Sequence, residues 1–493
     1  MLAVLIIDSA EHKILQSMAE TGRAPVLKGL MDRGLTLPLR SDAHLLDGSV
    51  FQTLLTGANP AVHGMYKYRQ LVPGTYGYAF SKARDTPIPQ IWAVLSDRGK
   101  RSCVFDVPKA FAFPEFNGSL VSSWSAYSAA ADSDSVPPQL FQNLIRRFGP
   151  HPQRHQVPIP LPAANYTEIR DHLVAAAMTR ADICSWMLSQ ENFDFFITTF
   201  SESHVAGHQF WHLRDSTHPL YNAQAADICA DGLETVYAGI DAAIGRIGEA
   251  LPSDATLIVM TQQGLMNNFT GSPYLPEWLS RRSGKNKKSI SSRLSVRLAS
   301  TFGSPLRAAI GRSLPEAITD RWISRKYRCD GDVFMLAGSE FMSFLRLNVH
   351  GREPRGTIPR GDYADQLNAL RNDLLQLENP HTGGPAVELV VFPRDLYSGP
   401  QVEALPDVVV CWRDDEPLHG LRCPTHGVIT DGIEFTDLTH SCHSGDGLAV
   451  LSGPKIAQGT HDWVVTMPEM TATWYDMLGE VIPDHVEGQP IHF

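Results

Sequence analysis

The feature that most constrains the fold is a set of short, mostly apolar segments that recur along the chain. They cover residues 2–7, 102–107, 195–200, 256–260 and 408–412. Continuous apolar runs of this length are typical of parallel strands that are buried on both faces. Longer segments with helical character, such as 169–188 and 225–250, lie between them. This alternation predicts an α/β fold, a doubly wound and mostly parallel sheet flanked by helices.

Composition and charge exclude several classes of protein. Apolar residues make up 43% of the 493 residues and the formal net charge is −11, which excludes a disordered chain and general nucleic-acid binding. The seven cysteines are scattered without a CxxC pair, so neither a disulfide framework nor a zinc ribbon is indicated. The N-terminus lacks a basic region before its apolar run, and no run approaches the length of a membrane span. We therefore expect a cytoplasmic location.

The charge is distributed unevenly. Residues 281–328 hold 13 Lys and Arg against Glu316 and Asp320, a local charge of +11, so the remaining residues carry −22. Apolar residues recur there with helical spacing, at Ile290, Leu294, Leu298 and Phe302. The segment could be a solvated surface helix, a lid over an anionic substrate or a helix in peripheral contact with an anionic membrane. We expect a basic, mostly helical insert or cap over 271–345, between two parts of the core, 1–270 and 346–493.

Two short segments concentrate histidines next to apolar runs. His204 and His208 stand four residues apart just after the run 195–200, with Glu202 close by. His440 and His443 precede another apolar run. Three imidazoles from separate loops at strand ends could complete a zinc shell with one open position, as in catalytic zinc sites. The alternative is that these are ordinary loop histidines with hydrogen bonds to the backbone.

The order of several motifs resembles the alkaline phosphatase superfamily, and its nearest branch is the type I phosphodiesterase/nucleotide pyrophosphatase-like hydrolases. The motifs are a strand with a terminal Asp8, TGxNPxxHG at 56–64, a strand followed by GH at 207–208, TxxGL at 261–265 and HxxDG with SGPxI at 443–456. Further similar segments lie at 346–356, 405–407, 468–478 and 488–490, so the resemblance covers nearly the whole chain. It implies an alkaline-phosphatase-like fold and a metal-dependent hydrolase or transferase that acts on a phosphate ester, phosphodiester or pyrophosphate.

Members of this superfamily typically hold two zinc ions, and the resemblance carries over unevenly. In relatives, one site uses the strand aspartate, here Asp8, the nucleophile, and an Asp-His pair. That pair aligns with Gln262 and Gln263 in this chain. A glutamine amide is a poor zinc ligand beside a carboxylate or an imidazole. The resemblance therefore implies one zinc ion rather than two, and the two amides could instead donate hydrogen bonds to phosphoryl oxygens.

The second site of the relatives is better preserved. His204 stands where relatives have an aspartate, His208 matches the histidine of the GH motif, and His443 matches the late histidine. Glu202 could add negative charge to this shell, and His440 is a further candidate ligand. The resemblance thus implies zinc at His204, His208 and His443.

The nucleophile of the relatives, a Thr or Ser, is replaced. Counting nine residues back from Thr56 reaches Asp47, with Ser49 two residues further on. An aspartate nucleophile can form an acyl-phosphate, whereas a serine needs a base or a metal to activate it. Asp47 could also be a metal ligand, or Asp47-Gly48 could simply form a turn.

Other classes of activity fit the sequence less well. The replaced Asp-His pair leaves open a degenerate family member that binds a small phosphorylated or anionic ligand without cleaving it. The Cys/Ser-x-Pro-x-Arg signature of sulfatases is absent near Asp47, and the chain has neither the GxSxG motif of serine α/β hydrolases nor a GxxxxGK[ST] phosphate loop.

Overall fold

A central sheet organises the computed structural model, which describes residues 1–125, 134–153, 163–284, 331–430 and 440–492. The sheet has ten strands, and β1 (Leu2–Ile7) lies at its centre. Parallel neighbours flank β1: β8 (Phe195–Phe200) on one side and β9 (Thr256–Thr261) on the other. Beyond β8 the sheet continues in parallel with β5 (Ser102–Phe105) and β6 (Gly118–Val121). The predicted α/β fold with a mostly parallel sheet is confirmed.

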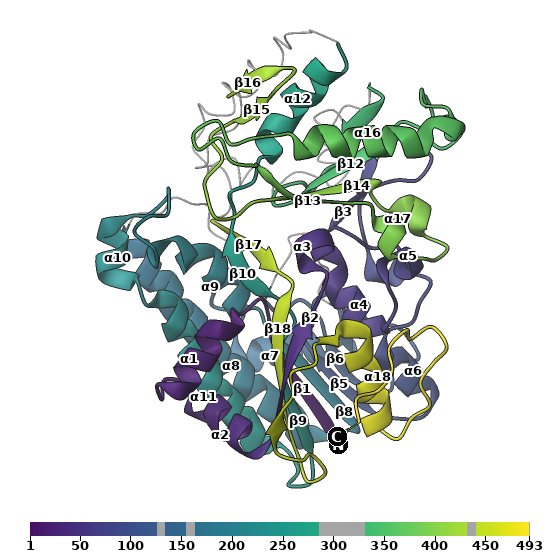
Figure 1. Ribbon diagram of the computed structural model, residues 1–493. Helices are drawn as coiled ribbons and strands as arrows, with labels where there is room; N and C mark the ends of the chain where they lie inside the picture. The colour runs from purple at the N-terminus through teal and green to yellow at the C-terminus, as the bar shows by residue number, and fades with distance from the viewer. Residues whose placement is uncertain (126–133, 154–162, 285–330, 431–439, 493) are drawn as a thin grey trace.

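Two hydrophobic cores, one on each face of the sheet, explain why β1 is apolar throughout. Ala3, Leu5 and Ile7 belong to one core and Leu2, Val4 and Ile6 to the other. Helices cover both faces (Figure 1). The first core is covered by α1 (His12–Glu20), α2 (Pro25–Arg33), α8 (Ala163–Gln190) and α11 (Gly232–Ala250), and the second by α4 (Val50–Thr56), α6 (Ile91–Asp97) and α18 (Met467–Met477).

Towards the other edge of the sheet, one strand, β18 (Asp446–Ser452), reverses the direction of its neighbours. β18 lies antiparallel between β9 and β2 (Leu35–Arg40). Two short strands, β19 (Gly459–Thr460) and β20 (Val465–Thr466), pair with β2. The C-terminal part of the chain therefore completes the same sheet that the N-terminus begins.

A second, antiparallel sheet occupies the upper part of Figure 1. Its order is β11 (Val333–Met335), β12 (Ser343–Leu347), β14 (Val408–Trp412) and β13 (Val387–Val391). It shares a hydrophobic core with α12 (Leu275–Arg282) and α16 (Tyr363–Leu375). Residues 408–412, which we expected in the parallel sheet, pair in this second sheet instead. The sequence misleads here because this strand is also covered on both faces and therefore also forms an apolar run. We expected the core to resume at residue 346, whereas the chain rejoins the main sheet at β18, which begins at Asp446.

Most of the basic segment 281–328 lies outside the described residues, which resume at 331. Among the described residues, no helix combines the length and apolar character that crossing a membrane requires.

Candidate metal centre

Three buried histidines converge at the carboxyl ends of the central strands. His204 and His208 lie one turn apart on α9 (Glu202–Phe210), which begins two residues after β8 ends. His443 comes from β17 (Ser441–Ser444), which pairs with β10 (Gly264–Asn267) just beyond β9. One ring nitrogen of each histidine lies within 4.8 Å of the others. The structure therefore assembles the predicted triad from segments more than 200 residues apart.

Electrostatics keep two of these imidazoles, those of His208 and His443, in the form that binds metals. Burial, followed by repulsion from neighbouring imidazoles, lowers the pKa of both His208 and His443 well below the ordinary value. Neutral imidazole offers a lone pair, whereas imidazolium does not. The fit to a metal ion such as zinc is therefore chemical as well as geometric.

Two of the rings also have a polar partner at Nδ1. Nδ1 of His208 lies 3.0 Å from Oγ of Ser441. Nδ1 of His204 lies 3.0 Å from Oγ of Ser9 and 3.4 Å from Oδ2 of Asp8. Metal-binding histidines usually have such a partner, which fixes the tautomer and the ring orientation. In both residues Nε2 is then the ring nitrogen that we assign to a metal.

Glu202 does not join this centre, in contrast to the expectation from sequence. Its carboxylate is fully buried and accepts hydrogen bonds from Arg180 and from Nε2 of His151 at 3.2 Å. Although burial by itself raises the pKa of a carboxyl group, Arg180 and His151 lower that of Glu202 to about 2. The negative charge that we assigned to the metal shell is compensated by a buried arginine.

His440 is the second correction to the predicted ligand set. Its ring lies against that of His212, with 3.6 Å between the ring centroids, and 6.3 Å from the ring of His218. His440 lies in a bend just before β17 (Ser441–Ser444), whereas His443 lies within that strand. His440 thus belongs to a neighbouring histidine cluster outside the triad.

The two glutamines lie where the motif places them but have partners within the protein. Nε2 of Gln262 donates to Oδ1 of Asp8, and Nε2 of Gln263 donates to Oγ of Ser9 at 2.6 Å. Gln262 and Asp8 are fully buried and Gln263 is nearly so. The structure thus gives these amides a role in holding the end of β1, and contact with a phosphoryl group remains a prediction.

Asp47 and Ser49, the two candidate nucleophiles, have different environments. Oδ2 of Asp47 accepts a hydrogen bond from Nζ of Lys67 at 2.7 Å, and Oδ1 has no hydrogen-bond partner among the described residues. The hydroxyl of Ser49 is fully buried and donates to the carbonyl of Leu46 at 2.6 Å. Of the two, Asp47 alone has a reactive oxygen that the protein does not already use.

Lys67 links Asp47 to the histidine triad. Burial alone would lower the pKa of this lysine, but Asp47 and Glu340 raise it above the ordinary value, so it is a buried cation. Its Nζ lies 4.9 Å from the ring centroid of Phe341. That ring stacks on His208, 6.0 Å between centroids, and packs against His443. Positive charge is thereby placed beside the triad.

Sequence reasoning missed Ser9, Lys67, Phe341 and Arg180. Ser9 follows Asp8 directly, and Lys67 lies within the segment 45–68 that carries one of the family motifs, so closer reading could have found both. The sequence around Phe341 contains no motif that predicts a place at the site. Phe341 lies between β11 and β12 of the second sheet, and its contact with the triad depends on the tertiary fold. Arg180 lies within α8, far from every motif.

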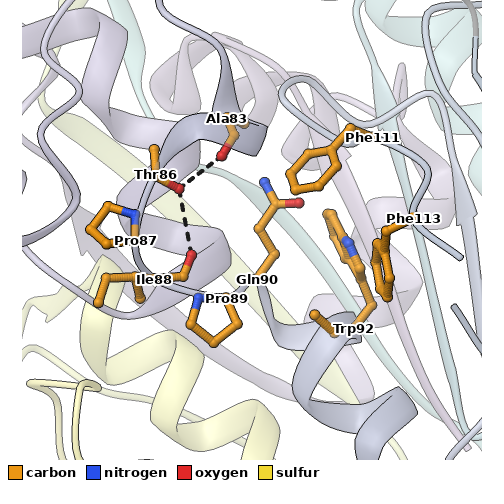
Figure 2. A pocket seen from close by; sticks show the side chains of 10 residues that line it. Ala83, Thr86, Pro87, Ile88, Pro89, Gln90, Trp92, Phe111 and Phe113 are labelled. Carbon is orange, nitrogen blue, oxygen red and sulfur yellow. Dashed lines mark hydrogen bonds between the residues drawn. The ribbon is translucent and has the colours of Figure 1, made fainter. Parts of the chain in front are cut away.

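A separate pocket of about 300 Å³ lies beside α6 (Figure 2). Aromatic and proline residues make up half of its lining: Trp92, Phe111, Phe113, Pro87 and Pro89. Nε2 of Gln90, another lining residue, donates to the carbonyl of Lys109 at 3.1 Å. None of the residues that line it is one of the predicted site residues.

The fold and the site together define the class of protein. A mostly parallel central sheet with helices on both faces, and a site at the carboxyl ends of its central strands where Asp8 and three histidines gather, match a hydrolase of the alkaline phosphatase superfamily. Within it, the chain belongs to the type I phosphodiesterase/nucleotide pyrophosphatase family, whose model matches residues 2–415. Family membership identifies the protein as a phosphoester or phosphodiester hydrolase. No curated protein matches it in sequence.

Solved structures confirm the fold across the whole chain. The alkaline phosphatase PafA shares 13% identity and a TM-score of 0.56, with 99% of this chain and 98% of that chain covered. Phosphonoacetate hydrolase from Sinorhizobium meliloti 1021, in complex with phosphonoformate, shares 13% identity and a TM-score of 0.54 over 97% and 95%. An inactive murine ectonucleotide pyrophosphatase/phosphodiesterase 5 in complex with AMP shares 11% sequence identity and a TM-score of 0.50, with 98% of this chain and 96% of that chain covered.

Proposed function

We propose that this protein cleaves a phosphate ester, phosphodiester or pyrophosphate of a small substrate at a metal ion held by His204, His208 and His443. The convergence of these three buried histidines, of which burial keeps His208 and His443 neutral, is the observation that carries the proposal. Three nitrogen ligands with one open position suit zinc better than magnesium or calcium, which prefer oxygen. When bound, zinc would polarise a nonbridging oxygen or activate a water molecule.

Charge favours a small anionic substrate. The buried ammonium group of Lys67 lies beside Phe341, which contacts two rings of the triad. A cation held in a dry site attracts a phosphoryl group more strongly than one in water does. Phosphonoformate and AMP, found with the structural neighbours, are both small phosphorus-containing anions.

We propose Asp47 as the nucleophile. Lys67 stabilises its ionised form, so the carboxylate needs no base to activate it. Attack by an Asp47 oxygen on phosphorus would expel the alcohol or phosphate leaving group and leave an acyl-phosphate, which water then hydrolyses.

The nucleophile can be tested by trapping. Protein quenched in acid during turnover is expected to contain a peptide with a phosphoryl label on Asp47. Hydroxylamine should remove this label, because acyl-phosphates react with hydroxylamine. The Asp47→Asn variant should give no label. Intact-protein and peptide mass spectrometry would measure both. A label on another residue, or steady turnover without any label, would assign the attack to a different group or to water.

The reaction class is tested with a panel of chromogenic substrates. Zinc-loaded protein should release nitrophenol from a phosphate monoester or from a phosphodiester, and chelation followed by dialysis should abolish that release. The main alternative is a family member that binds an anionic ligand without cleaving it, which the Gln262 and Gln263 replacements favour. Stoichiometric zinc with no hydrolysis of any ester or pyrophosphate in the panel would support this alternative.

A further inference from the structure

We propose that Asp8, Ser9, Gln262 and Gln263 form a fixed hydrogen-bond network that occupies the place of the family's second metal ion and orients His204 as a ligand of the first. The inference rests on the proposed metal centre, and it assigns Ser9 a role as a positioning residue. In relatives, the positions of Asp8, Gln262 and Gln263 supply ligands to a second zinc ion. The four side chains come from the ends of two adjacent strands, β1 and β9.

The donors around Asp8 do not suit a cation. Oδ1 of Asp8 accepts hydrogen bonds from Nε2 of Gln262 and, at 3.0 Å, from Oγ of Ser9. Oδ2 faces Nδ1 of His204 at 3.4 Å. Hydrogen atoms of an amide and a hydroxyl thus point at Oδ1, and a histidine faces Oδ2, where a cation would have to bind. A neutral amide and a hydroxyl here satisfy a buried carboxylate, which otherwise carries a large desolvation cost.

Counting hydrogens at Ser9 fixes the tautomer of His204. A serine hydroxyl donates one hydrogen bond and can accept two. The Ser9 hydroxyl hydrogen goes to Asp8, which can only accept, and one lone pair accepts from the Gln263 amide, which can only donate through Nε2. The remaining lone pair faces Nδ1 of His204 at 3.0 Å, so Nδ1 must carry the hydrogen. The lone pair of His204 is then on Nε2, the nitrogen that we assign to the metal.

The backbone of Ser9 supports a specific role for its side chain. Ser9 has φ of +55°, a left-handed conformation that costs a residue with a Cβ about 1 kcal/mol and is usually left to glycine. In this conformation the chain turns directly after β1 and the hydroxyl reaches Asp8, Gln263 and His204 together. Glycine would relieve the strain but would remove the hydroxyl.

The first test measures how the hydroxyl of Ser9 affects metal binding. Ser9→Ala keeps the Cβ and the burial of the site, and we expect zinc affinity to fall about 10- to 100-fold, the usual effect of removing a partner of a metal-binding histidine. The absorption bands of a bound cobalt(II) substitute should shift, because the ring of His204 is no longer fixed. Zinc affinity and cobalt spectrum equal to wild type would overturn the role of Ser9.

A neighbouring serine provides the matched control. The hydroxyl of Ser203 is equally buried but donates only to the backbone carbonyls of Asp8 and Phe200, at 2.6 and 2.8 Å. Ser203→Ala should therefore leave zinc affinity and the cobalt spectrum unchanged. An equal loss in both serine variants would indicate general loosening of the strand end and would also overturn the proposal.

The second test asks whether the amides exclude a second ion. Elemental analysis after dialysis against zinc should find one zinc ion per chain in the wild type, and two in the double variant Gln262→Asp with Gln263→His. In that variant the new carboxylate lies next to buried Asp8, so zinc should raise Tm more than in the wild type. Two ions in the wild type, or one in a folded double variant, would overturn the proposed exclusion.

These measurements are independent of catalysis. One zinc ion and a Ser9-dependent affinity without any ester hydrolysis would refute the proposed function and leave the network intact. Hydrolysis with two bound zinc ions would support the proposed function and refute the exclusion of a second ion by the network.

Discussion

Replacing His208 with alanine is expected to remove the bound metal and to lower kcat/KM for a phosphodiester about 1000-fold, since a catalytic metal contributes several kcal/mol to the transition state. The effect should be large because only two imidazoles of the triad would remain. Zinc should also stop stabilising the fold: wild-type protein should gain about 2.7 kcal/mol at a zinc concentration 100 times Kd, and the variant almost nothing. Elemental analysis, steady-state kinetics and thermal unfolding with and without zinc measure the three effects.

The matched control for this prediction is His440→Gln. His440 is also buried, but its ring packs against His212 outside the triad. We expect this variant to keep one zinc ion and most of the activity. Unchanged zinc and turnover in His208→Ala would refute the metal centre, and loss of zinc in His440→Gln would restore His440 to the ligand set.

The strands of the main sheet were the most predictable part of the fold. Residues 195–200 form β8 as expected, because a central strand is covered on both faces and its apolar run has no interruption. The same pattern led us to place 408–412 in the wrong sheet, because this strand of the second sheet is also covered on both faces. A residue's burial is encoded in its own apolarity, whereas the identity of the sheet that buries it depends on distant partners.

The site shows a similar division. His204, His208 and His443 were predictable because their spacing and order follow a family motif, and the structure brings them together. Glu202 was misassigned for a physical reason: its charge is balanced by Arg180, an interaction across 22 residues of sequence that no motif contains. Charge type can be read from a sequence, but the partner that neutralises a buried charge is a property of packing.

Arg180 connects the helical layer to the metal centre. It is fully buried on α8 and binds Glu202 at the first position of α9 and Asp106 just after β5, the latter at 2.8 Å. Glu202 in turn lies two residues before His204. A negative side chain in the first turn of α9 also interacts favourably with the helix dipole. The arginine thus fixes the start of the helix that carries two of the three metal ligands.

Replacing Arg180 with methionine is expected to destabilise the protein by about 3–5 kcal/mol, because two buried carboxylates would lose their cation. The control is Arg246→Met, whose half-exposed ion pair with Asp182 should contribute less than about 1 kcal/mol. The difference in the free energy of unfolding between the wild type and Arg180→Met should become smaller in acid. Glu202 has a folded pKa of about 2 against an ordinary value of 4.5, so its stabilising contribution is complete above pH 4.5 and is lost as the pH falls towards 2. Urea unfolding at pH 7 and at pH 4 measures both effects; a loss in Arg180→Met no larger than that in Arg246→Met would show that the buried network does not hold α9 in place.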